Sequence, residues 1–207
     1  MDVVRAHRIA EQYCALLEPG CKRIHIAGSV RRKKPDVDDI ELVAEPNFAP
    51  VFNLFGDKVG ERNLLHELLD ALQADGQITL DDQVRRDGLR YKRFAHMDHG
   101  AMQAISIDLF IVNPPAQWGV IFALRTGPAD YSHWLVSQRS KGGAMLAETY
   151  CKDGAIWYDD IPLPMVDERE FFTFLDLEYI EPEKRRPTWY KFNAEKVYGS
   201  RHEPLHP

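Results

Sequence analysis

The sequence predicts an α/β (α+β) protein with a small C-terminal α/β subdomain, and two observations support this fold class. Up to about residue 127, segments with apolar residues at helical spacing alternate with short strand-like segments. Beyond that point the chain changes character, to a predicted hairpin and a short helix. We expect a first domain over residues 1–127, a subdomain over 128–187 and a tail over 188–207.

The first predicted elements have clear ends. Helical spacing predicts a helix over residues 3–18, which a Pro-Gly pair terminates. Alternation of apolar and polar residues predicts strands over 23–28 and 39–44. An amphipathic pattern predicts a helix over 61–74.

Strands are also expected over 77–80, 90–96 and 103–112. Asn113, followed by two prolines, is typical of a helix start, and another helix is expected from Pro128 to about residue 141. The peptide bond between Gly127 and Pro128 is expected to be cis. Three aromatic residues are expected to pack in the core: Trp118, Phe122 and Trp134.

The C-terminal part carries two local signals. Asp153 and Gly154 mark the turn of a predicted hairpin. Asp167 is the expected N-cap of a short helix, with Glu170 at the capping-box position.

The composition is that of an ordinary soluble globular protein, with 207 residues, of which 44% are hydrophobic and 28% charged. No apolar run reaches transmembrane length and no signal peptide is evident, so we expect an intracellular, cytoplasmic protein, compatible with a prokaryotic or viral host. Three cysteines without a C-x-x-C spacing argue against a disulfide framework or a structural zinc site. The net charge of −6 weakens, but does not exclude, a nucleic-acid-binding function, because the basic residues are clustered.

Three acids point to a metal site. Asp39 and Glu41 stand on either side of Ile40 at the start of a predicted strand, so their carboxylates share one face and repel unless a cation separates them. Asp108 is a third acid, in an otherwise apolar strand, where a lone charge is costly unless it is paired or bound to metal. Three carboxylates on neighbouring strands can hold two Mg²⁺ ions. The alternative is three unrelated acids, with Asp108 paired to an arginine.

A short motif precedes these acids. Residues 28–32 are Gly-Ser-Val-Arg-Arg. A Gly-Ser pair, a basic pair, an acid-x-acid strand and a later third acid together resemble the nucleotidyltransferase superfamily, and within it the family X DNA polymerases. The resemblance covers about residues 20–187. It implies a nucleotidyltransferase palm with a mixed β-sheet flanked by helices and a thumb-like C-terminal subdomain, without lyase or fingers domains.

The resemblance continues downstream, with two departures. Thr126-Gly127 is similar to the family's turn before the helix beneath the incoming nucleotide, and residues 168–186 are similar to the end of its last subdomain. Glu41 stands where the polymerases normally carry Asp. Leu124-Arg125 replaces an aromatic pair. Both departures bear on the substrate more than on the reaction.

The resemblance implies a metal-dependent enzyme that adds nucleotides to a DNA 3′-hydroxyl and releases pyrophosphate, in a role such as DNA repair. Asp39, Glu41 and Asp108 are the expected catalytic and metal-binding residues, for two Mg²⁺ ions that Mn²⁺ can replace. The expected nucleotide-binding residues are Gly28, Ser29, Arg32, Leu124, Arg125, Thr126 and Gly127. Arg32 is expected to bind the triphosphate, whereas Arg31 has a solvated surface position as its alternative.

Other polar residues carry weaker expectations. Arg90, Lys92 and Arg93 are candidate contacts to nucleic-acid phosphates, with a solvated strand face as the alternative. Asp36 and Asp38 are expected in a loop. A His-rich stretch is expected to form a polar turn rather than a metal site; its polar residues are His96, Asp98 and His99.

A dNTP or NTP and a weakly bound DNA primer-template are the expected partners of a monomeric protein. The first alternative is a nucleotidyltransferase that acts on RNA, a protein or a small molecule. The second is a non-catalytic nucleotide-binding module.

Overall fold

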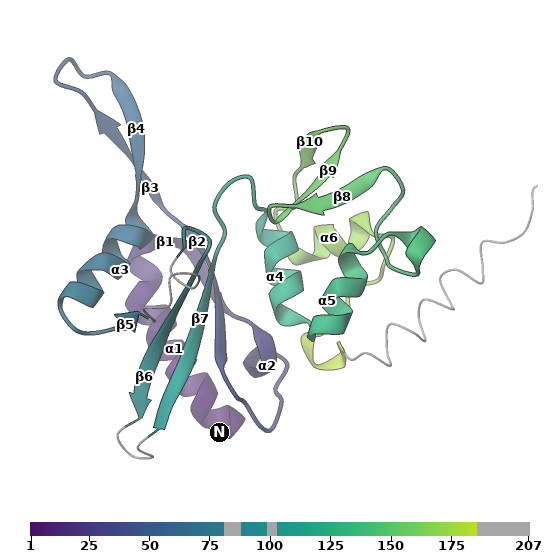
Figure 1. Cartoon of the computed structure of the whole chain (residues 1–207), viewed down its shortest axis with the longest axis horizontal. Coiled ribbons are helices and arrows are strands. Elements are labelled where there is room, and N and C mark those ends of the chain that lie inside the picture. Colours follow the sequence, from purple (N-terminus) through teal and green to yellow (C-terminus); the bar gives the residue numbers. More distant parts are fainter. Residues whose placement is uncertain (81–87, 99–102, 186–207) are drawn as a thin grey trace, which may run out of the picture.

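The computed structural model describes residues 1–80, 88–98 and 103–185, which form an α/β structure with two lobes (Figure 1). The helices are α1 (Val3–Leu17), α2 (Gly28–Arg31), α3 (Leu64–Ala74), α4 (Trp118–Thr126), α5 (Ala129–Val136) and α6 (Glu168–Phe174), with 3₁₀ turns η1 (Glu18–Gly20), η2 (Arg139–Lys141) and η3 (Pro182–Lys184). The strands are β1 (Cys21–Ile26), β2 (Ile40–Pro46), β3 (Phe48–Phe52), β4 (Lys58–Asn63), β5 (Thr79–Leu80), β6 (Tyr91–Asp98), β7 (Gln103–Ile111), β8 (Thr149–Lys152), β9 (Ala155–Tyr158) and β10 (Ile161–Leu163).

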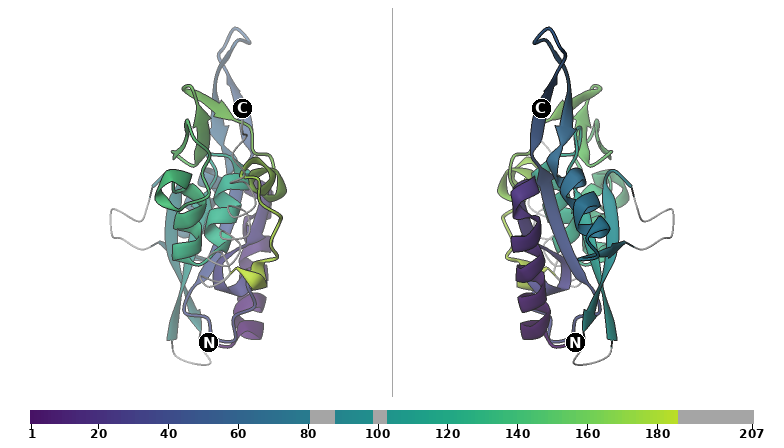
Figure 2. Two further views of the ribbon diagram at one scale, coloured as in Figure 1. Left: turned by 90° about the vertical axis from the view of Figure 1, so that its right-hand side faces the viewer. Right: turned by 90° about the vertical axis from the view of Figure 1, so that its left-hand side faces the viewer.

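The first lobe is built on a five-stranded sheet in the order β1-β2-β7-β6-β5. Strands β2 and β7 pair in parallel and the other neighbours pair antiparallel, so the sheet is mixed, as expected. Helices α1 and α3 lie on one side of it, where Leu42 and Leu109 pack with residues of both helices (Figure 2). The opposite face carries Val43, which packs against Trp118 of the second lobe.

The second lobe combines α4, α5 and α6 with a three-stranded sheet, β10-β9-β8. Val120 of α4, Tyr131 of α5 and Phe171 of α6 belong to one core. Residues of β7 pack in the core of the first lobe, whereas residues of α4 and α5 pack in the core of the second lobe. The expected boundary at residue 127 therefore falls between two helices that share a core. The expected aromatic core positions are confirmed, with exposed fractions of at most 9% for Trp118, Phe122 and Trp134.

Two predicted helices begin later than expected. The helix expected over 61–74 begins at Leu64, because the preceding residues pair in β4. The helix expected after Asn113 begins at Trp118, because the chain first makes a turn in which the Ala116 amide donates to the Asn113 carbonyl.

Two further details around α5 differ from expectation. The helix ends at Val136 rather than near residue 141, because the next residue has an extended backbone. Among the described residues the cis peptide bond joins Pro114 to Pro115, and the bond between Gly127 and Pro128 is not cis.

The hairpin turn and the helix N-cap predicted for the C-terminal part are both confirmed. Strands β8 and β9 pair on either side of the Asp153-Gly154 turn. The Asp167 side chain caps α6, with its Oδ1 accepting a hydrogen bond from the Glu170 amide at 2.9 Å. The expected tail over 188–207 lies outside the described residues.

A projecting hairpin was not predicted. Strands β3 and β4 form an antiparallel hairpin that projects from the first lobe (Figure 1). At its tip the Asn53 side chain accepts hydrogen bonds from the amides of Phe55 and Asp57, both at 2.9 Å, which fixes the loop. Leu54 and Phe55 are 101% and 89% exposed.

Candidate functional site

Two of the three predicted acids, Glu41 and Asp108, lie side by side on the face of the sheet that turns toward the second lobe, and Asp39 lies next to them. Glu41 of β2 and Asp108 of β7 are direct partners in the parallel register. Asp39 lies just before β2, which begins at Ile40, so it is not on the strand as expected. It nonetheless lies close enough for the charge of Asp108 to raise its pKa.

The charges of this site repel one another. Burial, and then the neighbouring Asp39, raise the pKa of Glu41 from 4.5 to about 7. Burial, and then Asp108, raise the pKa of Asp39. Partly buried carboxylates that oppose one another's ionisation are stabilised by a cation between them, and their oxygen atoms suit Mg²⁺ or Mn²⁺.

The carboxylates are not already arranged as a metal site. Within the part of the chain that the structure describes, no group of three His, Cys, Asp or Glu side chains has ligand geometry around one point. Their proximity and donor chemistry fit a divalent cation, and side-chain rotation is needed to complete its coordination.

Position 28 requires glycine because Glu41 lies directly against it. Its φ of +58° lies in the left-handed region, and a Cβ built on it would stand 1.8 Å from Glu41 Oε2. A side chain at this position would displace the carboxylate. Gly28 of the Gly-Ser motif thus allows α2 to lie directly against β2, the strand that carries Glu41.

Ser29 and Arg32 lie on the same side of the acids. Ser29 Oγ is buried and has no hydrogen-bond partner among the described residues, so it is an available donor. Arg32 donates from Nη1 to the Thr126 carbonyl at 2.6 Å. Burial lowers the pKa of Arg32, and the nearby Glu41 carboxylate opposes this.

A cavity of about 480 Å³ opens beside the acids. It is lined by Arg32, Asp39, Glu41, Leu124, Arg125, Gly127, Pro128, Ala129, Ser132, His133 and Val136. Four expected nucleotide-binding residues are therefore on its wall, namely Arg32, Leu124, Arg125 and Gly127. Thr126 is fully buried behind that wall.

Arg125 is held between the two lobes. Its guanidinium lies 3.9 Å from the centre of the Phe110 ring, which is a cation–π arrangement. Burial lowers the pKa of Arg125, and the attraction of Glu41 partly offsets the effect. Arg125 thus supplies positive charge beside the acids.

The three basic candidates on β6 and before it have different surroundings. Arg93 pairs with Asp108, with Nε 2.5 Å from Oδ1, which is the arginine partner foreseen as the alternative for this acid. Lys92 is only 6% exposed and points to the opposite face, so it is not on the surface beside the site. Arg90 is exposed and pairs with Asp153 at 2.6 Å.

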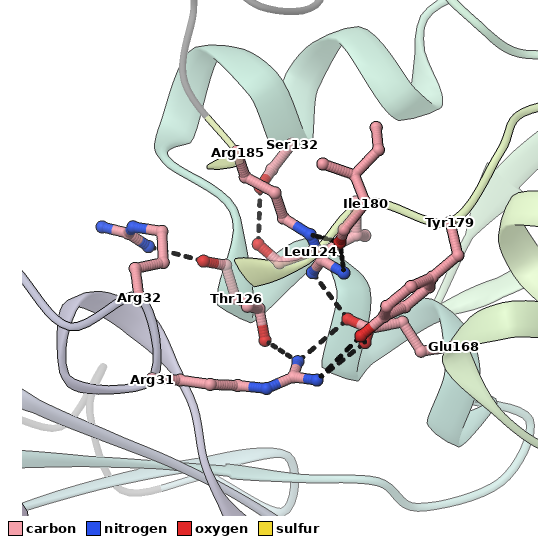
Figure 3. A network of polar contacts seen from close by, with 9 residues as sticks. All are labelled: Arg31, Arg32, Leu124, Thr126, Ser132, Glu168, Tyr179, Ile180 and Arg185. Carbon is pink, nitrogen blue, oxygen red and sulfur yellow. Dashed lines mark hydrogen bonds and ion pairs between the residues drawn. The ribbon is translucent and has the colours of Figure 1, made fainter. Parts of the chain in front are cut away.

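A buried group of charges was missed by sequence reasoning. Glu168 of α6 accepts hydrogen bonds from Arg31 at 2.8 and 3.0 Å, from Arg185 at 2.6 Å and from the Tyr179 hydroxyl at 3.0 Å (Figure 3). Arg31 also donates to Thr126 Oγ1 at 2.5 Å. We call Arg31, Glu168, Tyr179 and Arg185 the interlobe cluster, because Arg31 comes from the first lobe and the others from the second.

The interlobe cluster gives Arg31 a structural position instead of a solvated one. The Arg31 side chain is 19% exposed and that of Arg185 is fully buried. Sequence spacing carries no signal for contacts between residues 137 positions apart. The two arginines of the motif therefore have different positions: Arg31 contacts the second lobe, and Arg32 lines the cavity.

The remaining polar candidates do not line the cavity, although the charge of Asp38 contributes to the raised pKa of its neighbour Asp39. Asp36 and Asp38 are exposed, as expected of loop residues. His96 lies in β6, where its Nδ1 is 3.2 Å from the Tyr13 hydroxyl. His99 lies outside the described residues.

In the described parts of the chain, no helix has the length and apolar character needed to cross a membrane. No model of a known protein family matches the chain, and no curated protein matches it.

Proposed function

We propose that this protein is a metal-dependent nucleotidyltransferase, most closely resembling a minimal family X DNA polymerase. One observation carries the proposal: three mutually repelling carboxylates lie together, and two of them, Asp39 and Glu41, line a cavity of about 480 Å³. This is the arrangement that a reaction on a metal-bound triphosphate requires.

Asp39, Glu41 and Asp108 would hold two Mg²⁺ ions, or Mn²⁺ in their place. When bound, the metals supply charge neutralisation for the triphosphate and activation of the attacking hydroxyl. Arg32, which lines the cavity, binds phosphate oxygens. The Ser29 hydroxyl has no partner among the described residues, but it is buried and does not line the cavity. The acceptor oxygen forms a bond to the α-phosphorus, the bond to pyrophosphate breaks, and Asp108 accepts the hydroxyl proton.

The leading acceptor is a DNA 3′-end, on the strength of the sequence resemblance. Transfer to RNA, a protein or a small molecule is the second candidate, favoured by Glu41 and by the net charge of −6. A non-catalytic nucleotide-binding module is the third candidate, and the buried acids disfavour it because binding alone does not require all three.

The test is incubation with labelled dNTPs and NTPs, Mg²⁺ or Mn²⁺, and gapped, blunt or single-stranded primers. The wild-type protein is compared with Asp39→Ala, Glu41→Ala and Asp108→Ala, and with the exposed loop variant Asp36→Ala as matched control. We expect each of the three to abolish transfer and the control to retain it. Near-normal activity in any of the three, or no transfer by the wild type to any acceptor, contradicts the proposal.

A further inference from the structure

Asp108 is held by two residues of the neighbouring strand. Arg93 of β6 is its direct partner in the antiparallel register. The guanidinium makes a two-point contact, with Nε 2.5 Å from Oδ1 and Nη2 2.7 Å from Oδ2. The Tyr91 hydroxyl adds a third bond, to Oδ1, at 2.8 Å.

These bonds leave the Asp108 carboxylate few lone pairs with which to bind a metal ion. Each carboxylate oxygen accepts about two strong interactions. Among the described residues, Oδ1 accepts from Arg93 and Tyr91, whereas Oδ2 accepts from Arg93 only. Asp108 in this arrangement therefore offers one position to a cation, on Oδ2. Oδ1 becomes available only when Arg93 or Tyr91 moves away.

The contact also changes the charge of the site. Asp39, Glu41 and Asp108 together carry three negative charges when ionised. The guanidinium of Arg93 neutralises one of them at hydrogen-bond distance, and the Asp108 side chain is only 7% exposed, so water screens the pair weakly. Arg93 thereby lowers by one the negative charge with which the three acids attract a divalent cation, in addition to the positive charges of Arg32 and Arg125 beside Glu41.

We propose that Arg93 is a positioning residue that stands in for a cation at Asp108 and thereby sets the affinity of the site for divalent metal. While metal is absent, Arg93 fixes the orientation of the third carboxylate and limits the repulsion among the acids. When metal binds, Arg93 gives up part of its contact with Asp108. This inference rests on the proposed function, since it requires that the three acids bind metal.

The role predicts opposite changes in two quantities. Arg93→Gln removes the charge and the two-point contact, so the metal-free site attracts a cation more strongly, and we expect Mn²⁺ to bind about tenfold more tightly. The same variant leaves Asp108 free to rotate, so turnover at saturating metal should fall. A purely structural role would not tighten metal binding.

The experiment is a Mn²⁺ titration of the full chain without nucleotide, in which free Mn²⁺ is followed by electron paramagnetic resonance. Wild type, Arg93→Gln, Arg93→Lys and Glu41→Gln are compared. Lysine keeps the charge but not the two-point contact, so its affinity should lie between those of wild type and Arg93→Gln. It also provides the comparison if Arg93→Gln fails to fold.

The outcomes separate this inference from the proposed function. If wild type binds Mn²⁺ no better than Glu41→Gln, the acids are not the metal site and the proposed function fails. If wild type binds and Glu41→Gln does not, the metal site stands. In that case unchanged or weaker Mn²⁺ binding by Arg93→Gln, or by Arg93→Lys where only that variant folds, overturns the role given to Arg93.

Discussion

Removing the charge of Glu168 tests whether the interlobe cluster stabilises the fold. Glu168 is 5% exposed and is the carboxylate that pairs with both Arg31 and Arg185. Glu168→Gln keeps the shape of the side chain but leaves Arg185, itself 1% exposed, as a buried charge without its counter-ion. Breaking a buried pair on one side costs about 3–5 kcal/mol.

The assay is unfolding by heat and by urea. For a chain of this length each kcal/mol lowers the melting temperature by about 2–4 °C, so we expect a drop of roughly 6 to 20 °C. Glu178→Gln, an exposed position in the same segment, is the control and should change the free energy of unfolding by less than about 0.5 kcal/mol. A loss below about 1 kcal/mol in Glu168→Gln would refute the reasoning.

The same carboxylate predicts a pH dependence. Burial raises the pKa of Glu168, but the hydrogen bonds from Arg31 and Arg185 outweigh burial and leave the pKa below the ordinary value of 4.5. The stability that it contributes is present above pH 4.5 and is lost as the pH falls through the lowered value. Glu168→Gln should therefore flatten the acid limb of the stability curve, below about pH 4.5.

Three further predictions concern the candidate active site. Gly28→Ala should cost about 1–2 kcal/mol in stability from its φ of +58° and should weaken Mn²⁺ binding, because its Cβ displaces the Glu41 carboxylate; retained affinity in the same titration would contradict this. The raised pKa of Glu41, about 7, means that the metal-free folded protein binds more protons than the unfolded chain between pH 4.5 and 7. Urea unfolding in chelator should show stability falling as pH rises through that window, and Glu41→Gln should lose that dependence. Leu124 and Arg125 line the cavity in place of a rigid aromatic wall, so discrimination between dATP and ATP should be weak, and Leu124→Tyr should strengthen it. A preference of several thousand-fold for dATP in wild type, measured as kcat/KM, would contradict this prediction.

Local signals in the sequence predicted much of the fold. The periodicity of α1 and the turn at Asp153-Gly154 depend on neighbouring residues alone, so both were predicted from the chain. The starts of α3 and α4 were wrong because pairing in β4 and a turn after Asn113 override the helical pattern. The predicted limit at residue 127 came from a local change of pattern, whereas the membership of a core depends on packing between distant residues.

The candidate site was predictable to the extent that its residues share a strand or a motif. Asp39, Glu41 and Asp108 were identified as a group from alternation and from the cost of a lone buried charge, and the structure brings them together. The partnership of Arg93 with Asp108 depends on strand register, which the sequence does not specify. In the sequence, Glu168 looks like an ordinary acidic residue in the first turn of a helix. Its contact with Arg31 arises only from the tertiary fold and could not be predicted.

The projecting β3–β4 hairpin has a consequence for how the molecule opens. Among the described strands these two pair only with each other, so their amides are protected by one ladder rather than by a packed core. A two-stranded hairpin alone is marginally stable in water. Its amides should therefore exchange with solvent deuterium through frequent local opening, while those of β2 and β7, central in the five-stranded sheet, should exchange only when the whole lobe unfolds. Two regimes of hydrogen exchange in one chain would make the hairpin an energetically separate unit, free to change in sequence or length with little effect on the sheet that carries the acids.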